Sequence, residues 1–328
     1  MKLWKKAALL MALCMALSLL AACGGDAGQD DKDSNDKATV ENQQNDDGKE
    51  EDKKQDETEA VLVPEEEYVL ISESSSKFAD NYFYDDQGRI AKVEEYYDGK
   101  LKYNVLYSYE EGADGTVICN AIHYFANGAD DRGRLYEQTD EFIYDSQGLL
   151  LKEIVYSRGE KRRYEYSTEY AYDDQGRLIQ QWGYKNGSDS EAELVDMLEY
   201  IYDDQGRLDR KNVYIKSTTE MSYYWDYGYN EKGENDYYVQ LKPDGTRYGY
   251  GFDEGTPAPE GPTHAWEYRY HDNGTVRLAE QKRLDLGNTI CTEKYDEYGM
   301  LISVRDEKTG NTNTLEYAPL SQAPRVEQ

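Results

Sequence analysis

Aromatic and polar residues alternate with a period of two along most of the chain beyond about residue 65. A glycine recurs as a reference point, with Tyr four residues before it in seven copies and an aromatic residue six before it in six of these. Residues two apart share one face of a β-strand, and no helix would align them. The pattern predicts a sheet with one aromatic face, on which we expect the seven tyrosines to be mostly buried. They are Tyr84, Tyr144, Tyr172, Tyr202, Tyr229, Tyr270 and Tyr295.

The alternation resumes after each glycine. An apolar residue often stands two positions beyond it, and a tyrosine stands eight positions beyond it in four copies. Counted in steps of two, these later tyrosines fall on the same aromatic face. They are Tyr96, Tyr156, Tyr184 and Tyr214.

The glycine itself belongs to a turn. The tract Tyr-Asp-Asp-Gln-Gly-Arg-Leu occupies 172–178 and recurs unchanged at 202–208. This order predicts a type I turn followed by glycine in the left-handed region, with the first Asp accepting a hydrogen bond from the backbone two residues on. A second turn signal follows about eleven residues later in several copies, for example at Asp98-Gly99. Each repeat is therefore a pair of strands.

A fixed period of this kind indicates one small unit built repeatedly. We predict an all-β fold, an antiparallel meander of about sixteen strands over residues 65–328. Because strand twist accumulates across so wide a sheet, we expect a curled sheet or a partly closed β-spiral.

The Tyr-Asp-x-x-Gly-Arg-Leu motif resembles the YD repeats of bacterial Rhs-type proteins and the animal teneurins. Those families build long spirals of β-hairpins, which close into a shell in their large members. The resemblance covers about residues 80–310 and implies a β-spiral. This chain is too short to enclose a toxin domain, so the encapsulating function is not carried over.

The first 64 residues are not expected to belong to the folded part of the chain. Residues 1–22 combine a basic start with an apolar stretch, which predicts a signal peptide. The following Leu-Ala-Ala-Cys-Gly tract resembles the bacterial lipoprotein box, which implies lipidation of Cys23 and a membrane anchor. Residues 23–64 are acidic and polar, and we interpret them as a disordered tether. The expected location is extracytoplasmic, on the cell surface or the periplasmic face.

Charge and cysteine content narrow the function further. The chain has 37 Lys and Arg against 67 Asp and Glu, a formal net charge of −30, and no basic cluster. Nucleic acid is therefore not an expected partner. Beyond the signal peptide and Cys23, only Cys119 and Cys291 remain, and about ten strands would separate them in an open meander. We expect both to be free thiols, because a disulfide needs Cα atoms within about 7 Å.

The sequence has few features that indicate a catalytic site or a metal site. The three histidines, His123, His264 and His271, lack zinc-ligand spacing, and no nucleophile motif is present. The paired aspartates occupy turns and lack the alternating spacing of a calcium loop. We therefore expect no catalytic residue, no metal and no cofactor, and a protein that is not an enzyme.

Tryptophan offers the candidate contacts for a partner, at Trp182, Trp225 and Trp266, since aromatic rings stack on sugars and lie in protein interfaces. We expect a protein-binding or scaffold module of the cell envelope. The alternative is a carbohydrate-binding protein that uses the aromatic face, and a remoter one is an envelope hydrolase. A Pro-rich stretch at 253–263 interrupts the repeat and is a further candidate contact.

Overall fold

The computed structural model describes residues 64, 66–129, 135–157, 163–185, 193–246, 264–284 and 287–326. These residues form eighteen β-strands and a short 3-10 helix, η3 (Leu320–Gln322). The expected signal peptide, Cys23 and tether up to residue 63, and the Pro-rich stretch 253–263, lie outside the described residues.

The strands follow one another in sequence order around the sheet. The first nine are β1 (Tyr68–Ser74), β2 (Phe78–Tyr84), β3 (Ile90–Tyr97), β4 (Lys100–Glu111), β5 (Val117–Phe125), β6 (Tyr136–Tyr144), β7 (Leu150–Ser157), β8 (Arg163–Tyr172) and β9 (Leu178–Lys185). The next nine are β10 (Leu194–Tyr202), β11 (Leu208–Ile215), β12 (Tyr223–Tyr229), β13 (Asn235–Leu241), β14 (His264–Tyr270), β15 (Val276–Arg283), β16 (Asn288–Tyr295), β17 (Leu301–Asp306) and β18 (Thr312–Pro319).

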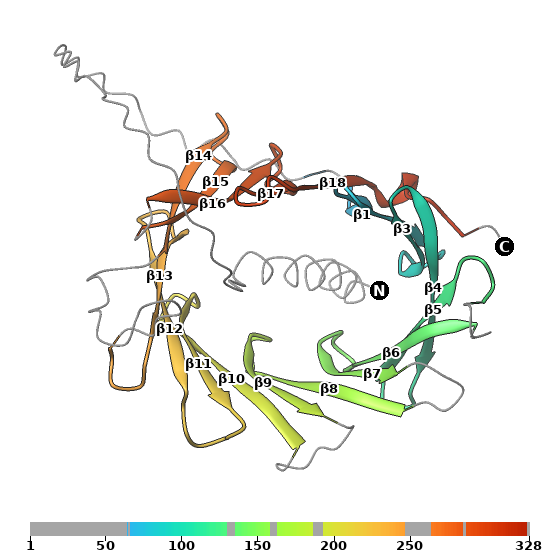
Figure 1. The fold of residues 1–328 in the computed structure, drawn as a ribbon, viewed down its shortest axis with the longest axis horizontal. Helices are drawn as coiled ribbons and strands as arrows, with labels where there is room; N and C mark the ends of the chain where they lie inside the picture. The colour runs from blue at the N-terminus through green and yellow to red at the C-terminus, as the bar shows by residue number, and fades with distance from the viewer. Residues whose placement is uncertain are drawn as a thin grey trace, which may run out of the picture.

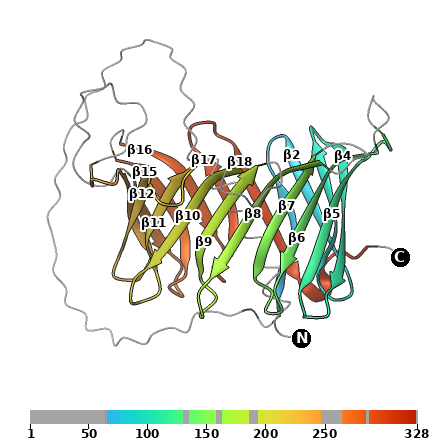
Figure 2. The ribbon, with the colours of Figure 1, turned by 90° about the horizontal axis from the view of Figure 1, so that it is seen from below.

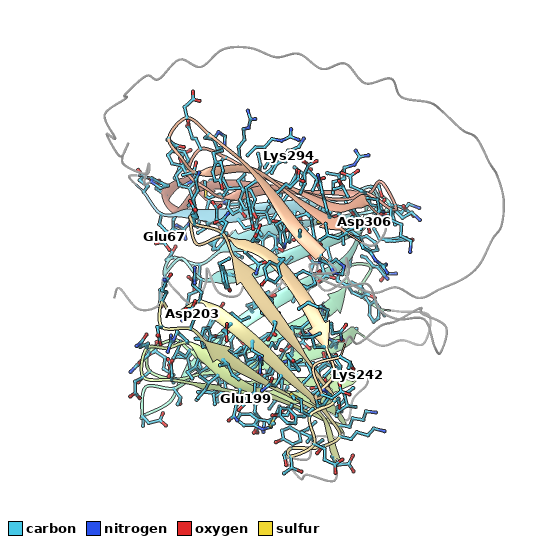
Figure 3. All side chains as sticks on the ribbon, turned by 90° about the vertical axis from the view of Figure 1, so that its left-hand side faces the viewer. Glu67, Glu199, Asp203, Lys242, Lys294 and Asp306 are labelled. Carbon is cyan, nitrogen blue, oxygen red and sulfur yellow. The ribbon has the colours of Figure 1, made fainter. Side chains whose placement is uncertain are left out.

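The sheet closes on itself. Every strand pairs with its sequence neighbours, and β1 pairs antiparallel with β18 from Tyr68 opposite Pro319 to Ser74 opposite Thr314. Figure 1 shows the resulting ring of strands, and Figure 2 shows the strands inclined between two rims, as closure of a barrel requires. The Tyr-Asp turns lie along one rim, here the motif rim, with Asp203 and Glu67; Lys242 and Asp306 mark the far rim (Figure 3).

These findings confirm the all-β antiparallel prediction and correct two details of it. The described residues hold eighteen strands instead of about sixteen, and the sheet is closed instead of curled or partly closed. The prediction relied on turn glycines to locate strands. It did not locate β1, because no Tyr-Asp turn adjoins this strand. Pairing of β1 with β18 removes the two exposed sheet edges that an open meander would leave.

The predicted turn chemistry is confirmed. In the repeat at 172–178, Asp173 Oδ1 accepts hydrogen bonds from the backbone N of Gln175 and of Arg177, each at 2.9 Å. Gly176 has φ = +76°, a value that only glycine adopts without strain. Arg177 Nε also donates to Asp173 Oδ2 at 2.7 Å, so the side chains of the motif hold the turn in shape.

Each turn is also tied to the next repeat. Tyr202 donates its hydroxyl to the backbone O of Leu178 at 2.7 Å, and the Arg177 guanidinium lies 4.7 Å from the centroid of the Tyr202 ring. The same pair of contacts joins Tyr229 to Leu208 and Arg207. The motif therefore encodes a contact between repeats, in which the arginine of one turn stacks on the tyrosine of the following hairpin.

The aromatic face lines the interior of the barrel. One pocket contacts side chains of this face on five adjacent strands, which only a concave surface allows; they are Asn313, Glu73, Asp80, Glu95 and Tyr103. The two hydrophobic clusters of the barrel include Tyr84 and Tyr144 of the predicted set, which are 3% and 5% exposed. The other five tyrosines of the set are half-buried.

The expectation for the later tyrosines was wrong. A register shift follows each of their turns: Tyr84 lies opposite Ile90, but Phe83 lies opposite Lys92. The extra residue of this bulge moves every later side chain of the strand to the opposite face. The tyrosines eight positions beyond the glycine, Tyr96, Tyr156, Tyr184 and Tyr214, therefore point away from the interior.

Two further observations complete the fold. Cys119 on β5 and Cys291 on β16 are both buried and form no disulfide, and seven strand steps separate them by the shorter way around the barrel. Among the residues described, no helix is long and apolar enough to span a membrane.

Candidate functional site

Two of the three candidate tryptophans lie close together on the interior face. Trp225 on β12 and Trp266 on β14 both stand eight residues before a turn glycine, and β13 runs between their strands. Tyr238 of β13 packs edge-on against Trp225 at 5.2 Å between ring centroids and stacks on His264 at 4.6 Å. We call Trp225, Tyr238, His264 and Trp266 the aromatic cluster.

Polar groups border the aromatic cluster. Gln281 Nε2 donates to the Tyr238 hydroxyl at 2.6 Å, which fixes the ring. Lys211 Nζ lies 5.8 Å from the centroid of the Trp225 ring, and desolvation lowers the pKa of this lysine. Rings with hydrogen-bonding groups at their margins suit a ligand that has both apolar and polar surfaces.

Trp182 does not belong to this arrangement. It lies on β9 opposite Glu169 of β8 and Met197 of β10, on the outward face. It follows the bulge after the turn at Gly176, which reverses the facing of the strand. Of the three tryptophans that the sequence indicates as candidate contacts, the structure therefore brings two together.

A row of three carboxylates occupies another part of the interior face. Glu73 of β1 lies directly opposite Asp80 of β2, and Asp80 lies directly opposite Glu95 of β3. Like charges at directly opposite positions destabilise a sheet. We call these three residues the acidic row. Within the described part of the chain, the side-chain carboxylates of Glu73 and Asp80 have no hydrogen-bond or ion-pair partner.

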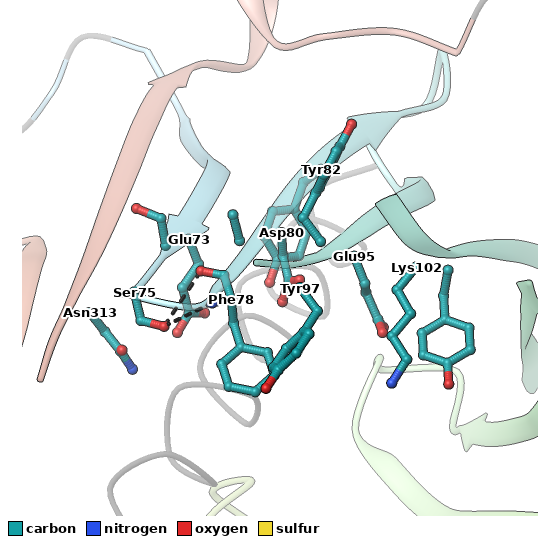
Figure 4. A pocket seen from close by; sticks show the side chains of 13 residues that line it. Glu73, Ser75, Phe78, Asp80, Tyr82, Glu95, Tyr97, Lys102 and Asn313 are labelled. Atoms are coloured by element: carbon teal, nitrogen blue, oxygen red, sulfur yellow. Dashed lines mark hydrogen bonds between the residues drawn. The ribbon is translucent and has the colours of Figure 1, made fainter. Parts of the chain in front are cut away.

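The acidic row opens into a pocket of about 400 Å³ at the far rim (Figure 4). The pocket lies between the β1–β2 and β3–β4 hairpins. Five aromatic residues line it, the interior-facing Phe78, Tyr82, Tyr97 and Tyr103 and the adjacent Tyr96, and the rings of Phe78 and Tyr97 are 5.0 Å apart. Tyr82, one of these residues, is only 2% exposed.

The acidic row has unusual electrostatics. Desolvation raises the pKa of Asp80 to about 7, with further contributions from the charges of Glu95 and Glu73. Desolvation also raises the pKa of Glu73. Asp80 is therefore close to half-ionised at neutral pH, and a bound positive charge would favour its ionised form.

His123 of β5 extends the charged region beyond the row. Its Nε2 lies 2.9 Å from Asp140 Oδ2 on β6, and its Nδ1 lies 3.6 Å from Glu95 Oε1. Desolvation opposes protonation of this histidine, but the hydrogen bond and charge of Asp140 and the charge of Glu95 outweigh it, so the pKa of His123 is raised. The histidine therefore partly neutralises Glu95 but does not reach Asp80.

The acidic row was missed in the sequence, although one signal for it exists. Asp80 stands eight residues before Gly88, the position that Trp225 and Trp266 hold in their repeats. An acidic residue at this repeat position is unusual. It can be recognised in the sequence once it is known that the position lies on the interior face. Among the described residues, no group of three His, Cys, Asp or Glu side chains is arranged to hold a metal ion.

Comparisons with known proteins identify no family. No family model matches the chain, and no curated protein sequence does. A porin-like protein from Bacteroides uniformis is similar in structure, with a TM-score of 0.38, 9% identity, and coverage of 76% of this chain and 98% of that one. The TcdB2-TccC3 structure gives a TM-score of 0.24 at 12% identity and covers 70% of this chain. The matched region spans 18% of that second chain. Likenesses of this degree establish no shared function.

Proposed function

We propose that this protein is a membrane-anchored extracytoplasmic lipoprotein that acts as a protein-binding or scaffold module in the cell envelope. The lipobox at Cys23 supports the anchor, and the acidic stretch that follows supports a tether. The observation that carries the binding function is the aromatic cluster on the interior face. Tryptophan and tyrosine are the residues most enriched where partners bind tightly, and this cluster is held by packing on three adjacent strands.

The same proposal places the hairpins in the YD-repeat class. It is supported by the link between the arginine of one turn and the tyrosine of the next hairpin, since this contact gives the Tyr, Asp, Gly and Arg of the motif one shared purpose. A closed wall of such repeats presents interior side chains on a rigid frame, which lowers the entropy lost when a partner binds.

A carbohydrate ligand is the second candidate. It is favoured by one observation, the Gln281 amide and the Lys211 ammonium beside the rings of the aromatic cluster. Sugars stack their apolar faces on aromatic rings and use their hydroxyls in hydrogen bonds at the margin.

Replacement of Trp225 by alanine is expected to weaken capture of the partner by about tenfold or more, because a central aromatic contact contributes about 2 kcal/mol or more to binding. The full chain is used as bait for envelope extracts and, in parallel, on a glycan array. Trp182→Ala is the matched control, since its side chain lies on the outward face. A protein retained by the wild type and the control, and lost with Trp225→Ala, supports the first candidate.

A glycan that follows the same order supports the second candidate. Equal capture by Trp225→Ala and the wild type would contradict both. The same cultures test the anchor, since radioactive palmitate should label the wild type and leave Cys23→Ala unlabelled. Equal labelling of that variant would contradict lipidation at Cys23.

A further inference from the structure

The pocket over the acidic row is separate from the aromatic cluster. It lies on β18 and β1 to β4, whereas the aromatic cluster lies on β12 to β14. Figure 4 shows Glu73, Asp80 and Glu95 along the pocket, with the rings of Phe78 and Tyr97 beside them. Its volume of about 400 Å³ is within the usual range for small-molecule sites, about 300–1,000 Å³.

The charges of the pocket are unbalanced. The groups that face Asp80 are Glu73 from β1 and Glu95 from β3, both acidic, while His123 is engaged with Glu95 and Asp140. Lys102 is the one basic residue among those that line the pocket, against three acidic ones, and its ammonium lies beside the rings of Tyr103 and Tyr97. Partly buried carboxylates without partners are unfavourable, and a cation placed between them would relieve both desolvation and mutual repulsion. The pocket therefore fits a positively charged ligand.

The aromatic lining indicates which kind of cation. Ammonium groups are attracted to the faces of tyrosine and phenylalanine rings, and aromatic walls around a carboxylate are a recurrent way of holding organic ammonium ions. The chain itself shows the contact: Lys102 Nζ lies 5.0 Å from the centroid of the Tyr103 ring and 5.9 Å from that of Tyr97. Both rings line the pocket.

We propose that this pocket binds an organic ammonium group, with Asp80 and Glu73 as its counter-charges and Tyr82, Tyr97 and Phe78 against its alkyl part. The group is either that of a free amine or the lysine side chain of a partner protein. Both sources present the same chemistry to the pocket. Binding here is independent of the aromatic cluster and goes beyond the function proposed above.

Calorimetric titration of the full-length protein in neutral detergent tests the proposal. The probes are cadaverine, choline and a short lysine-containing peptide, with the same peptide acetylated on lysine as the uncharged control. Binding of the small amines identifies a free amine as sufficient, and binding of the lysine peptide alone identifies a partner protein as the source. Binding of the acetylated peptide as tightly as the charged one would overturn the proposal.

The variants are Asp80→Asn and, as a matched control, Glu94→Gln. Glu94 precedes Glu95 but lies on the outward face, paired with Lys92 at 2.8 Å, so both substitutions remove one negative charge from the same region. Asp80→Asn is expected to weaken ammonium binding about tenfold or more, because it removes one charge-assisted contact. Glu94→Gln is expected to leave the affinity within about twofold of the wild type. Glu73→Gln removes the other proposed counter-charge of the pocket and should also weaken ammonium binding.

Absence of binding of every charged probe to the wild type would overturn the assignment, as would equal affinity of wild type and Asp80→Asn. Calcium added in tenfold excess over the amine should leave binding in place, and its displacement of the amine would show that the pocket prefers a metal ion. Capture of a partner through Trp225 is measured separately, so failure of this site leaves the proposed function standing.

Discussion

Asp80→Asn is expected to stabilise the folded protein by about 2–4 kcal/mol at pH 8. The pKa of Asp80 is about 7 in the fold, against 3.8 for the unperturbed group, because of desolvation and then the charges of Glu95 and Glu73. A shift of one pKa unit corresponds to about 1.4 kcal/mol, and the lower end of the range allows for the solvent that reaches this partly exposed side chain. Asparagine keeps the shape of the side chain and cannot ionise.

The pH dependence has a definite sign. Between pH 3.8 and about 7 the folded state binds more protons at Asp80 than the unfolded state, so stability of the wild type falls as pH rises through this window. The advantage of Asp80→Asn should therefore be full at pH 8 and shrink toward zero as pH falls to about 4. Urea unfolding at both pH values measures it. A variant less stable than the wild type at pH 8 would show that Asp80 has a stabilising partner.

Tyr84→Ala is expected to lower the free energy of unfolding by about 3–5 kcal/mol. The ring is 3% exposed and packs with Leu70 and Ile90 in the larger hydrophobic cluster, and its hydroxyl donates to the backbone O of Leu70 at 2.5 Å. Truncating a large buried aromatic side chain removes its burial energy and leaves a cavity. Urea unfolding of the variant measures the loss.

Tyr84→Phe separates the ring from the hydroxyl and should lose only about 1 kcal/mol, the usual net contribution of one hydrogen bond. Tyr172→Ala should lie between the two, since Tyr172 occupies the same repeat position but is half-buried. A loss below about 0.5 kcal/mol for Tyr84→Ala would mean that the interior face is not packed at this point.

Asp80→Asn and Tyr84→Ala are expected to change the free energy of unfolding in opposite directions. Tyr84 and Asp80 share a strand and a face, four residues apart. We expect the tyrosine to stabilise the fold and the aspartate to weaken it, because the aspartate faces Glu73 and Glu95. A residue that lowers stability is expected at a binding site, where function and stability commonly conflict.

Local chemistry was predictable from the sequence. The turn at Asp173 and Gly176 follows from residue types within five positions, and the structure has the hydrogen bonds expected of it. The alternation before each glycine gave the correct face for Tyr84 and Tyr144. The alternation after each glycine failed, because a bulge inserts one residue that no propensity marks; Tyr96 and Trp182 consequently face outward.

The sequence pattern did not predict contacts between distant parts of the chain. Closure depends on pairing of β1 with β18, whose residues are nearly 250 positions apart and lack the motif. The acidic row depends on register among β1, β2 and β3, since Glu73, Asp80 and Glu95 share no spacing from a turn glycine. Strand register is set by the whole sheet, and a list of local turns does not contain it.

Closure of the barrel is the central claim, since it creates the interior face on which both candidate sites lie. A cross-link between β1 and β18 tests it most directly. Ser72 lies opposite Glu316, and the Ser72 hydroxyl donates to Glu316 Oε2 at 3.0 Å, so cysteines at these two positions are within reach of each other. The double variant Ser72→Cys, Glu316→Cys is oxidised gently and its free thiols are counted.

The control pairs Ser72→Cys with Glu199→Cys, which lies on β10, nine strands away around the barrel. The closed barrel predicts an intramolecular disulfide in the first variant, seen as faster migration on a non-reducing gel and the loss of two thiols. It predicts none in the control. Retention of both introduced thiols in the first variant, in addition to those of Cys119 and Cys291, or cross-links only between molecules, would show that the sheet is open between β1 and β18.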